Sequence, residues 1–152
     1  MKTALIAALL CSSPVFAQQG LVSSASESTV RSLLAQELSF AQFGIQAQLT
    51  WQAEPTVGEE GVLRIELLDQ VTHQPVPAQV TPSVSLWMPS MGHGSSRTKV
   101  QAVRDSSGQP VPGAYLVSGI YFIMDGEWEV RVSLKNATGL EELQAFTLTP
   151  KG

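Results

Sequence analysis

Two methionines and a histidine lie within six residues of one another in the segment 88–93, which reads Met-Pro-Ser-Met-Gly-His. Thioether sulfur and imidazole nitrogen together suit a soft metal ion, above all Cu(I), better than they suit calcium or magnesium. Pro89 stiffens the start of this segment, and Gly92 permits a tight backbone path that lets the donor side chains converge. The spacing therefore predicts a shallow copper site in a loop, with Met91 and His93 as its main ligands.

Met88 and Met124 are additional candidate ligands, and all four candidates also have a purely structural interpretation. Met88 continues an alternating apolar strand and Met124 precedes a turn, so both could simply fill the core, as methionine often does. Met91 could cap the end of the fold, and His93 could be an ordinary surface histidine. The sequence leaves both interpretations open. If His93 is a ligand, binding should weaken as the pH falls through the range in which free histidine protonates, near about 6.5.

The first 17 residues have the features of a cleaved secretory signal peptide. Lys2 supplies a positive charge, a short apolar stretch follows, and residues 15–17 (Val-Phe-Ala) form a suitable cleavage sequence. The mature chain is then expected to begin at Gln18 and to be periplasmic or secreted; the alternative is a lipoprotein anchored through Cys11. Since Cys11 is the only cysteine, a cleaved chain has no thiol, and a soft-metal site must use methionine and histidine.

From Gly44 onward, apolar and polar residues alternate with the period of two that is typical of strands with one solvated face. The pattern predicts an all-β fold, an immunoglobulin-like antiparallel β-sandwich over residues 44–150, with a bulge at Ser118-Gly119. Residues 18–43 are expected to be a flexible segment with a short helix ending near Leu38. Strands are predicted over 44–52, 63–67, 83–88, 97–104, 115–124, 128–134 and 143–148.

The alternation of strand directions predicts where the candidate ligands lie. If consecutive strands pair antiparallel, the strands that end at Met88 and at Met124 point to the same end of the sandwich. The loop carrying Met91 and His93 is then at that end as well. His73 follows a strand of the opposite direction and is expected at the other end.

These residues resemble the YtkA-like/FixH-like family of small exported or membrane-anchored β-sandwich domains. The resemblance rests on the block 88–93, on Gly113-x-Tyr115, and on the alternating segment from Ile120 to Val132 (Ile-x-Phe-x-Met-x-Gly-x-Trp-x-Val-x-Val). It covers roughly residues 44–134. It implies an immunoglobulin-like fold and, by association, copper handling or support of copper-enzyme assembly. FixH-type proteins carry a membrane helix, whereas after residue 17 no segment approaches the roughly 20 apolar residues of a membrane span.

Two functional hypotheses follow. The first is an exported Cu(I) chaperone or buffer that exchanges copper with a donor or acceptor protein. The alternative is a metal-free immunoglobulin-like interaction module of an envelope complex. An enzyme is not expected, because no residues assemble a nucleophile and a base. With 13 acidic and 9 basic residues and no basic cluster, the chain is not expected to bind nucleic acid.

Overall fold

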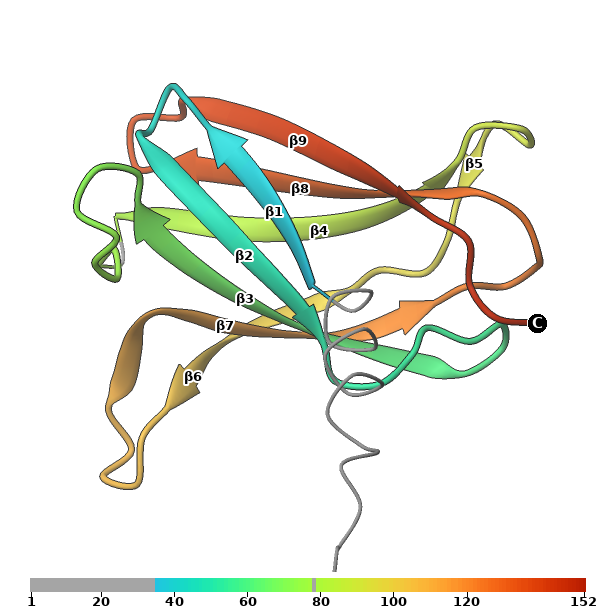
Figure 1. Cartoon of the computed structure of the whole chain (residues 1–152), viewed down its shortest axis with the longest axis horizontal. Helices are drawn as coiled ribbons and strands as arrows, with labels where there is room; N and C mark the ends of the chain where they lie inside the picture. Colours follow the sequence, from blue (N-terminus) through green and yellow to red (C-terminus); the bar gives the residue numbers. More distant parts are fainter. Residues whose placement is uncertain (1–34, 78) are drawn as a thin grey trace, which may run out of the picture.

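A computed structural model describes residues 35–77 and 79–152 (Figure 1). The predicted signal peptide and the first part of the predicted helix lie outside the described residues. Within the described part of the chain there is no helix that is long and apolar enough to cross a membrane. The described residues form nine strands: β1 (Ala35–Phe40), β2 (Ile45–Trp51), β3 (Glu60–Asp69), β4 (Val80–Met88), β5 (His93–Gly94), β6 (Lys99–Arg104), β7 (Pro110–Tyr121), β8 (Trp128–Asn136) and β9 (Glu141–Leu148).

The strands form two antiparallel sheets that pack face to face (Figure 1). One sheet has the order β1-β2-β3-β7-β6 and the other the order β5-β4-β8-β9. Strands β2-β3-β7-β6 correspond to the ABED sheet of immunoglobulin domains, and β5-β4-β8-β9 to the opposing sheet, C′CFG. The predicted immunoglobulin-like β-sandwich is therefore confirmed, with β1 added as an outer strand beside β2.

Strand β1 corrects the prediction for the segment before residue 44, where a helix was expected to run to about Leu38. Residues 35–40 are instead extended, with Leu38 and Phe40 buried and the other four residues exposed. A tight turn ending at Gly44, which has a φ of 63°, lets all of β1 pair with β2, from Ile45 to Thr50. The apolar spacing before residue 38 suggested a helix, but pairing with β2 and burial of two large side chains favour a strand.

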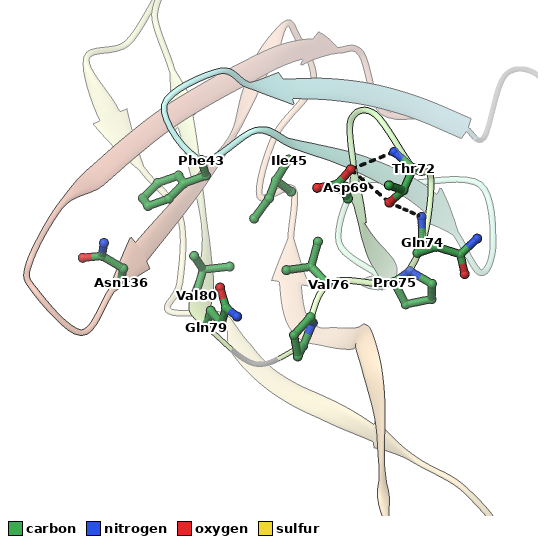
Figure 2. Close-up of a pocket in the computed structure, with 11 residues that line it drawn as sticks. Phe43, Ile45, Asp69, Thr72, Gln74, Pro75, Val76, Gln79, Val80 and Asn136 are labelled. Carbon is green, nitrogen blue, oxygen red and sulfur yellow. Dashed lines mark hydrogen bonds between the residues drawn. The ribbon is translucent and has the colours of Figure 1, made fainter.

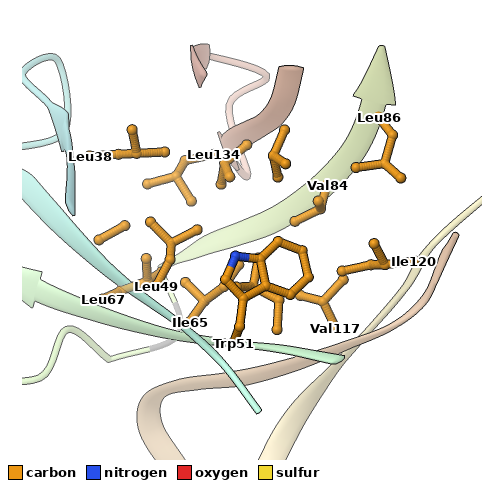
Figure 3. Close-up of a cluster of buried hydrophobic side chains, with 14 of the residues drawn as sticks. Leu38, Leu49, Trp51, Ile65, Leu67, Val84, Leu86, Val117, Ile120 and Leu134 are labelled. Atoms are coloured by element: carbon orange, nitrogen blue, oxygen red, sulfur yellow. The ribbon is translucent and has the colours of Figure 1, made fainter. Parts of the chain in front are cut away.

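The core lies between the two sheets and is built from the inward-facing positions of the alternating strands (Figure 3). On β8, Val130, Val132 and Leu134 are completely buried, as the alternating pattern predicted. Leu49 and Ile65, from the other sheet, are buried in the same cluster as these residues, and Figure 3 shows them with Leu134. Full burial of such side chains contributes roughly 1.5–3 kcal/mol each relative to exposure, so this face holds the sandwich together.

A β-bulge in β7 determines which end of the molecule the following loop reaches. Ser118 and Gly119 together face the single residue Val62 of β3, so the register shifts without ending the strand. Gly119 has a φ of 72°, and its backbone N–H donates to the carboxylate of Glu60 over 2.7 Å. The bulge confirms the prediction at these two residues, and because the strand continues through it, Met124 is carried to the same end as Met88.

Candidate metal site

The segment 88–93 forms the turn of a short hairpin between β4 and β5. Met88 pairs with His93 in the ladder, and the carbonyl oxygen of Met88 accepts hydrogen bonds from the N–H groups of Met91 (3.2 Å) and Gly92 (2.9 Å). Gly92 has a φ of 66°, a backbone conformation that glycine adopts without strain. Pro89 supplies the fixed φ suited to the first turn position. The sequence therefore encodes a closed turn that holds its two ends in register.

Met88 and His93 point to the same side of the sheet because they are directly opposite each other in an antiparallel ladder. The Met88 side chain is buried in the core, with 4% of its surface exposed. The His93 ring is half-buried and packs against the ring of Trp128, with 6.3 Å between centroids and an interplanar angle of 74°. The imidazole thus covers the end of the core beside the Met88 thioether.

A hydrogen bond orients the His93 ring and favours one tautomer of its neutral form. Its Nδ1 atom lies 3.0 Å from the carbonyl oxygen of Gly94. A carbonyl oxygen can only accept, so Nδ1 must carry the proton and donate it. The Nε2 atom of the neutral ring then has a free lone pair, which is the arrangement of a metal-binding histidine oriented by a backbone carbonyl.

The loop between β7 and β8 contacts the same end of the molecule. The indole Nε1 of Trp128 donates to the carbonyl oxygen of Met124 over 3.1 Å, and the Met124 side chain packs against the core. A Cβ atom added to Gly126 would lie only 2.6 Å from the Cε methyl of Met88. The Met88 side chain therefore extends to the loop that carries Met124. Among the amino acids, only glycine at position 126 leaves room for the Met88 methyl group.

Met91 differs from the other candidate ligands in its exposure. It lies at the tip of the β4–β5 hairpin with 59% of its surface exposed. The four candidates thus lie at one end of the sandwich, the end at which Figure 1 shows β5. His73 follows the opposite end of β3 and has a φ of 55°. This is the separation that the alternation of strand directions predicted.

An aromatic cluster beneath the hairpin was not predicted as part of the site. Phe122 packs against Trp51 (6.0 Å between centroids, 57°) and against Trp128 (5.8 Å, 76°), and His93 extends the row. All three rings are buried. The sequence does contain a signal for this cluster. Trp51 is the last residue of β2 and Trp128 is the first residue of β8, so both rings lie at this end of the sandwich. The cluster gives the imidazole a rigid support.

Among residues 35–77 and 79–152, no three His, Cys, Asp or Glu side chains are grouped so that they could hold a metal ion. The soft donors that the hairpin itself presents are the thioethers of Met88 and Met91 and the imidazole of His93. Such a donor set fits a soft monovalent ion and does not fit calcium or magnesium.

A depression at the opposite end of the sandwich, of about 410 Å³, has a different character (Figure 2). Apolar side chains of Phe43, Ile45 and Val80 form one part of it. Asp69 lies at another part, where its Oδ1 accepts from the N–H of Thr72 over 2.7 Å. None of the residues that line it is a methionine or a histidine, so it is separate from the candidate metal site.

The comparisons with known proteins agree with this architecture. The crystal structure of a DUF4426 family protein from Pseudomonas aeruginosa PAO1 is similar, with a TM-score of 0.54 and 12% sequence identity, covering 79% of this chain and 98% of that one. At this identity the likeness shows the fold alone. A search of curated proteins found no match. The sequence profile of the YtkA-like family matches residues 42–133, more than half of the chain. The chain therefore belongs to the YtkA-like family of β-sandwich domains.

Proposed function

We propose that this protein is an exported copper-binding protein that holds Cu(I) at the β4–β5 hairpin. His93 supplies nitrogen through Nε2, Met91 supplies a thioether from the solvent side, and Met88 supplies one from the core side. Met124 is the fourth candidate donor, in the neighbouring loop. The observation that carries the proposal is the Met88–His93 pair, which shares one face of the ladder while the Nδ1–H bond to Gly94 leaves Nε2 free.

The chemistry of these donors supports Cu(I) over other ions. Thioethers are neutral, soft and not protonated in water, so they remain competent ligands in an acidic compartment, and unlike thiols they do not pair into disulfides. One imidazole adds a stronger donor that binds only in its neutral form. Because Met91 and His93 reach the surface, the site suits exchange of copper with another protein, and the role is that of a chaperone or buffer and not of an enzyme.

Export through the signal sequence at residues 1–17 accompanies this proposal, since a thiol-free soft site suits an oxidising compartment. The physiological partner is then a copper donor or acceptor protein of the cell envelope.

The second candidate function is a metal-free interaction module. It is favoured by the burial of Met88 and by the packing of Met124 against the core, since both thioethers already have a structural role.

Anaerobic titration of the purified protein with Cu(I), in competition with a chromogenic chelator, separates the two functions. We expect a single Cu(I) per chain and a loss of affinity of at least about tenfold in His93→Ala, because the only imidazole of the site is removed. His73→Ala is the matched control, since His73 is the only other histidine and lies at the opposite end. Equal affinities in the His93→Ala variant and the unmodified chain would exclude the copper site and favour the interaction module.

A further inference from the structure

The three methionines of the described residues differ sharply in their access to solvent. Met88 has 4% of its surface exposed and its methyl group contacts Gly126. Met124 is partly buried and packs against the core. Met91 has 59% of its surface exposed at the hairpin tip. A water-borne oxidant therefore reaches the sulfur of Met91 before it reaches the other two.

We propose that Met91 is an oxidation site that controls the metal site: a peroxide converts its thioether to a sulfoxide and thereby releases copper. The inference rests on the proposed function for its copper-releasing consequence, whereas the selectivity for Met91 follows from exposure alone. The sulfur lone pair attacks one oxygen of hydrogen peroxide, an S–O bond forms, and the O–O bond breaks. The oxygen bound to sulfur gives its proton to the leaving hydroxide, which departs as water, so sulfur loses two electrons and the peroxide gains them.

The sulfoxide is a poor substitute for the thioether as a Cu(I) ligand. It is polar and presents a hard oxygen, whereas Cu(I) is held by soft sulfur. The donor set at the hairpin is then reduced to His93 and the two less accessible methionines. Because sulfoxide reductases reverse the modification, the release of copper is reversible as well.

Oxidation at Met91 leaves the fold intact, which distinguishes it from general oxidative damage. The exposed Met91 side chain is not among the residues that form the core cluster, so a sulfoxide there remains solvated. A sulfoxide at Met88 would instead bury a polar group among apolar neighbours without a partner, and this destabilises a fold. The modification therefore changes copper affinity without changing the free energy of unfolding.

The test uses hydrogen peroxide on the metal-free protein, followed by peptide mapping by mass spectrometry. We expect oxygen addition at Met91 at least about tenfold faster than at Met88 or Met124, with an unchanged denaturation midpoint. The Cu(I) affinity of the oxidised protein should fall to that of Met91→Leu, and a methionine sulfoxide reductase should restore it. Peroxide treatment of Met91→Leu should cause no further loss. Silver(I), which takes the same soft ligands, should protect Met91 from peroxide.

Oxidation of Met88 or Met124 as fast as Met91 would overturn the proposed selectivity. Unchanged Cu(I) affinity after selective oxidation of Met91, or no protection by silver(I), would overturn the proposed control of the metal site. Failure of the untreated protein to bind Cu(I) would remove the proposed function and the copper release together, while the peptide map would still decide whether Met91 is the preferred oxidation site.

Discussion

Met88 and His93 face each other directly across the β4–β5 ladder, with their side chains on the same side of the sheet. One side chain enters the core and the other covers its end, where it contacts Trp128. The hairpin thus joins a buried thioether to a partly exposed imidazole.

Trp128→Ala should reduce the free energy of unfolding by about 3–5 kcal/mol, because a completely buried indole is removed. The indole packs against Phe122 and His93 and donates to the Met124 carbonyl oxygen. Trp128→Phe keeps a ring but loses the donor, so it should cost less. Urea denaturation measures the free energy of unfolding of both variants. An unchanged midpoint in Trp128→Ala would show that this ring does not stabilise the sandwich.

Gly126→Ala should displace the Met88 methyl group, because the new Cβ would lie 2.6 Å from it. The matched control is Gly139→Ala: Gly139 also has a positive φ, of 89°, but no atom lies within 4 Å of its added Cβ. Both variants should lose stability through backbone strain, by about 1 kcal/mol or more. Only Gly126→Ala should also weaken Cu(I) binding in a chelator competition. Equal Cu(I) affinities in the two variants would argue against Met88 as a ligand.

Glu142→Ala should cost about 1–3 kcal/mol, because it leaves two backbone donors without their acceptor. The Glu142 side chain on β9 is buried, and its carboxylate oxygens accept from the N–H groups of Ala41 (3.1 Å) and Gln42 (3.0 Å) in the β1–β2 turn. The exposed Glu59 provides the control, since Glu59→Ala should change the free energy of unfolding by no more than about 0.5 kcal/mol. Chemical denaturation compares the two, and similar midpoints would mean that this contact does not stabilise β1.

Asp69 should contribute to the acid sensitivity of the fold. The N–H groups of Thr72 and Val71 and the Thr72 hydroxyl donate to its carboxylate and hold the pKa of Asp69 below its ordinary value. Since the pKa is lowered by folding, the stabilisation is complete above the unfolded value of about 3.9 and is lost as the pH falls through the lower folded value. In Asp69→Asn, stability should therefore fall less between about pH 5 and pH 2 than in the unmodified chain. If the free energy of unfolding falls equally with pH in Asp69→Asn and in the unmodified chain, the prediction is refuted.

Much of the fold could be predicted because the strands from residue 44 onward alternate with a period of two. The bulge at Ser118-Gly119 could be recognised as well, and with it the direction of the strand leading to Met124. Strand β1 could not, because the apolar spacing before Leu38 matches a helix and only pairing with β2 makes a strand preferable. The residue pattern of one segment does not contain the stabilisation that comes from pairing with the next strand and from burial in the core.

The candidate site could be predicted only in outline. The donor residues and their common end follow from spacing and strand direction. The contact of His93 with Trp128 and that of Met88 with Gly126 join residues more than 30 positions apart, so no local pattern indicates them. The exposure of Met91 is likewise a property of the folded hairpin.

The most direct test of the copper site is an NMR titration that follows the methionine methyl and histidine imidazole signals during anaerobic addition of Cu(I). The chain has two histidines, at opposite ends of the sandwich, so each serves as a reference for the other. We predict that the signals of His93, Met91 and Met88 shift together and stop shifting at one equivalent, while those of His73 stay in place. Signals of His93 and Met91 that do not move, or signals of His73 that move with them, would contradict the proposed site.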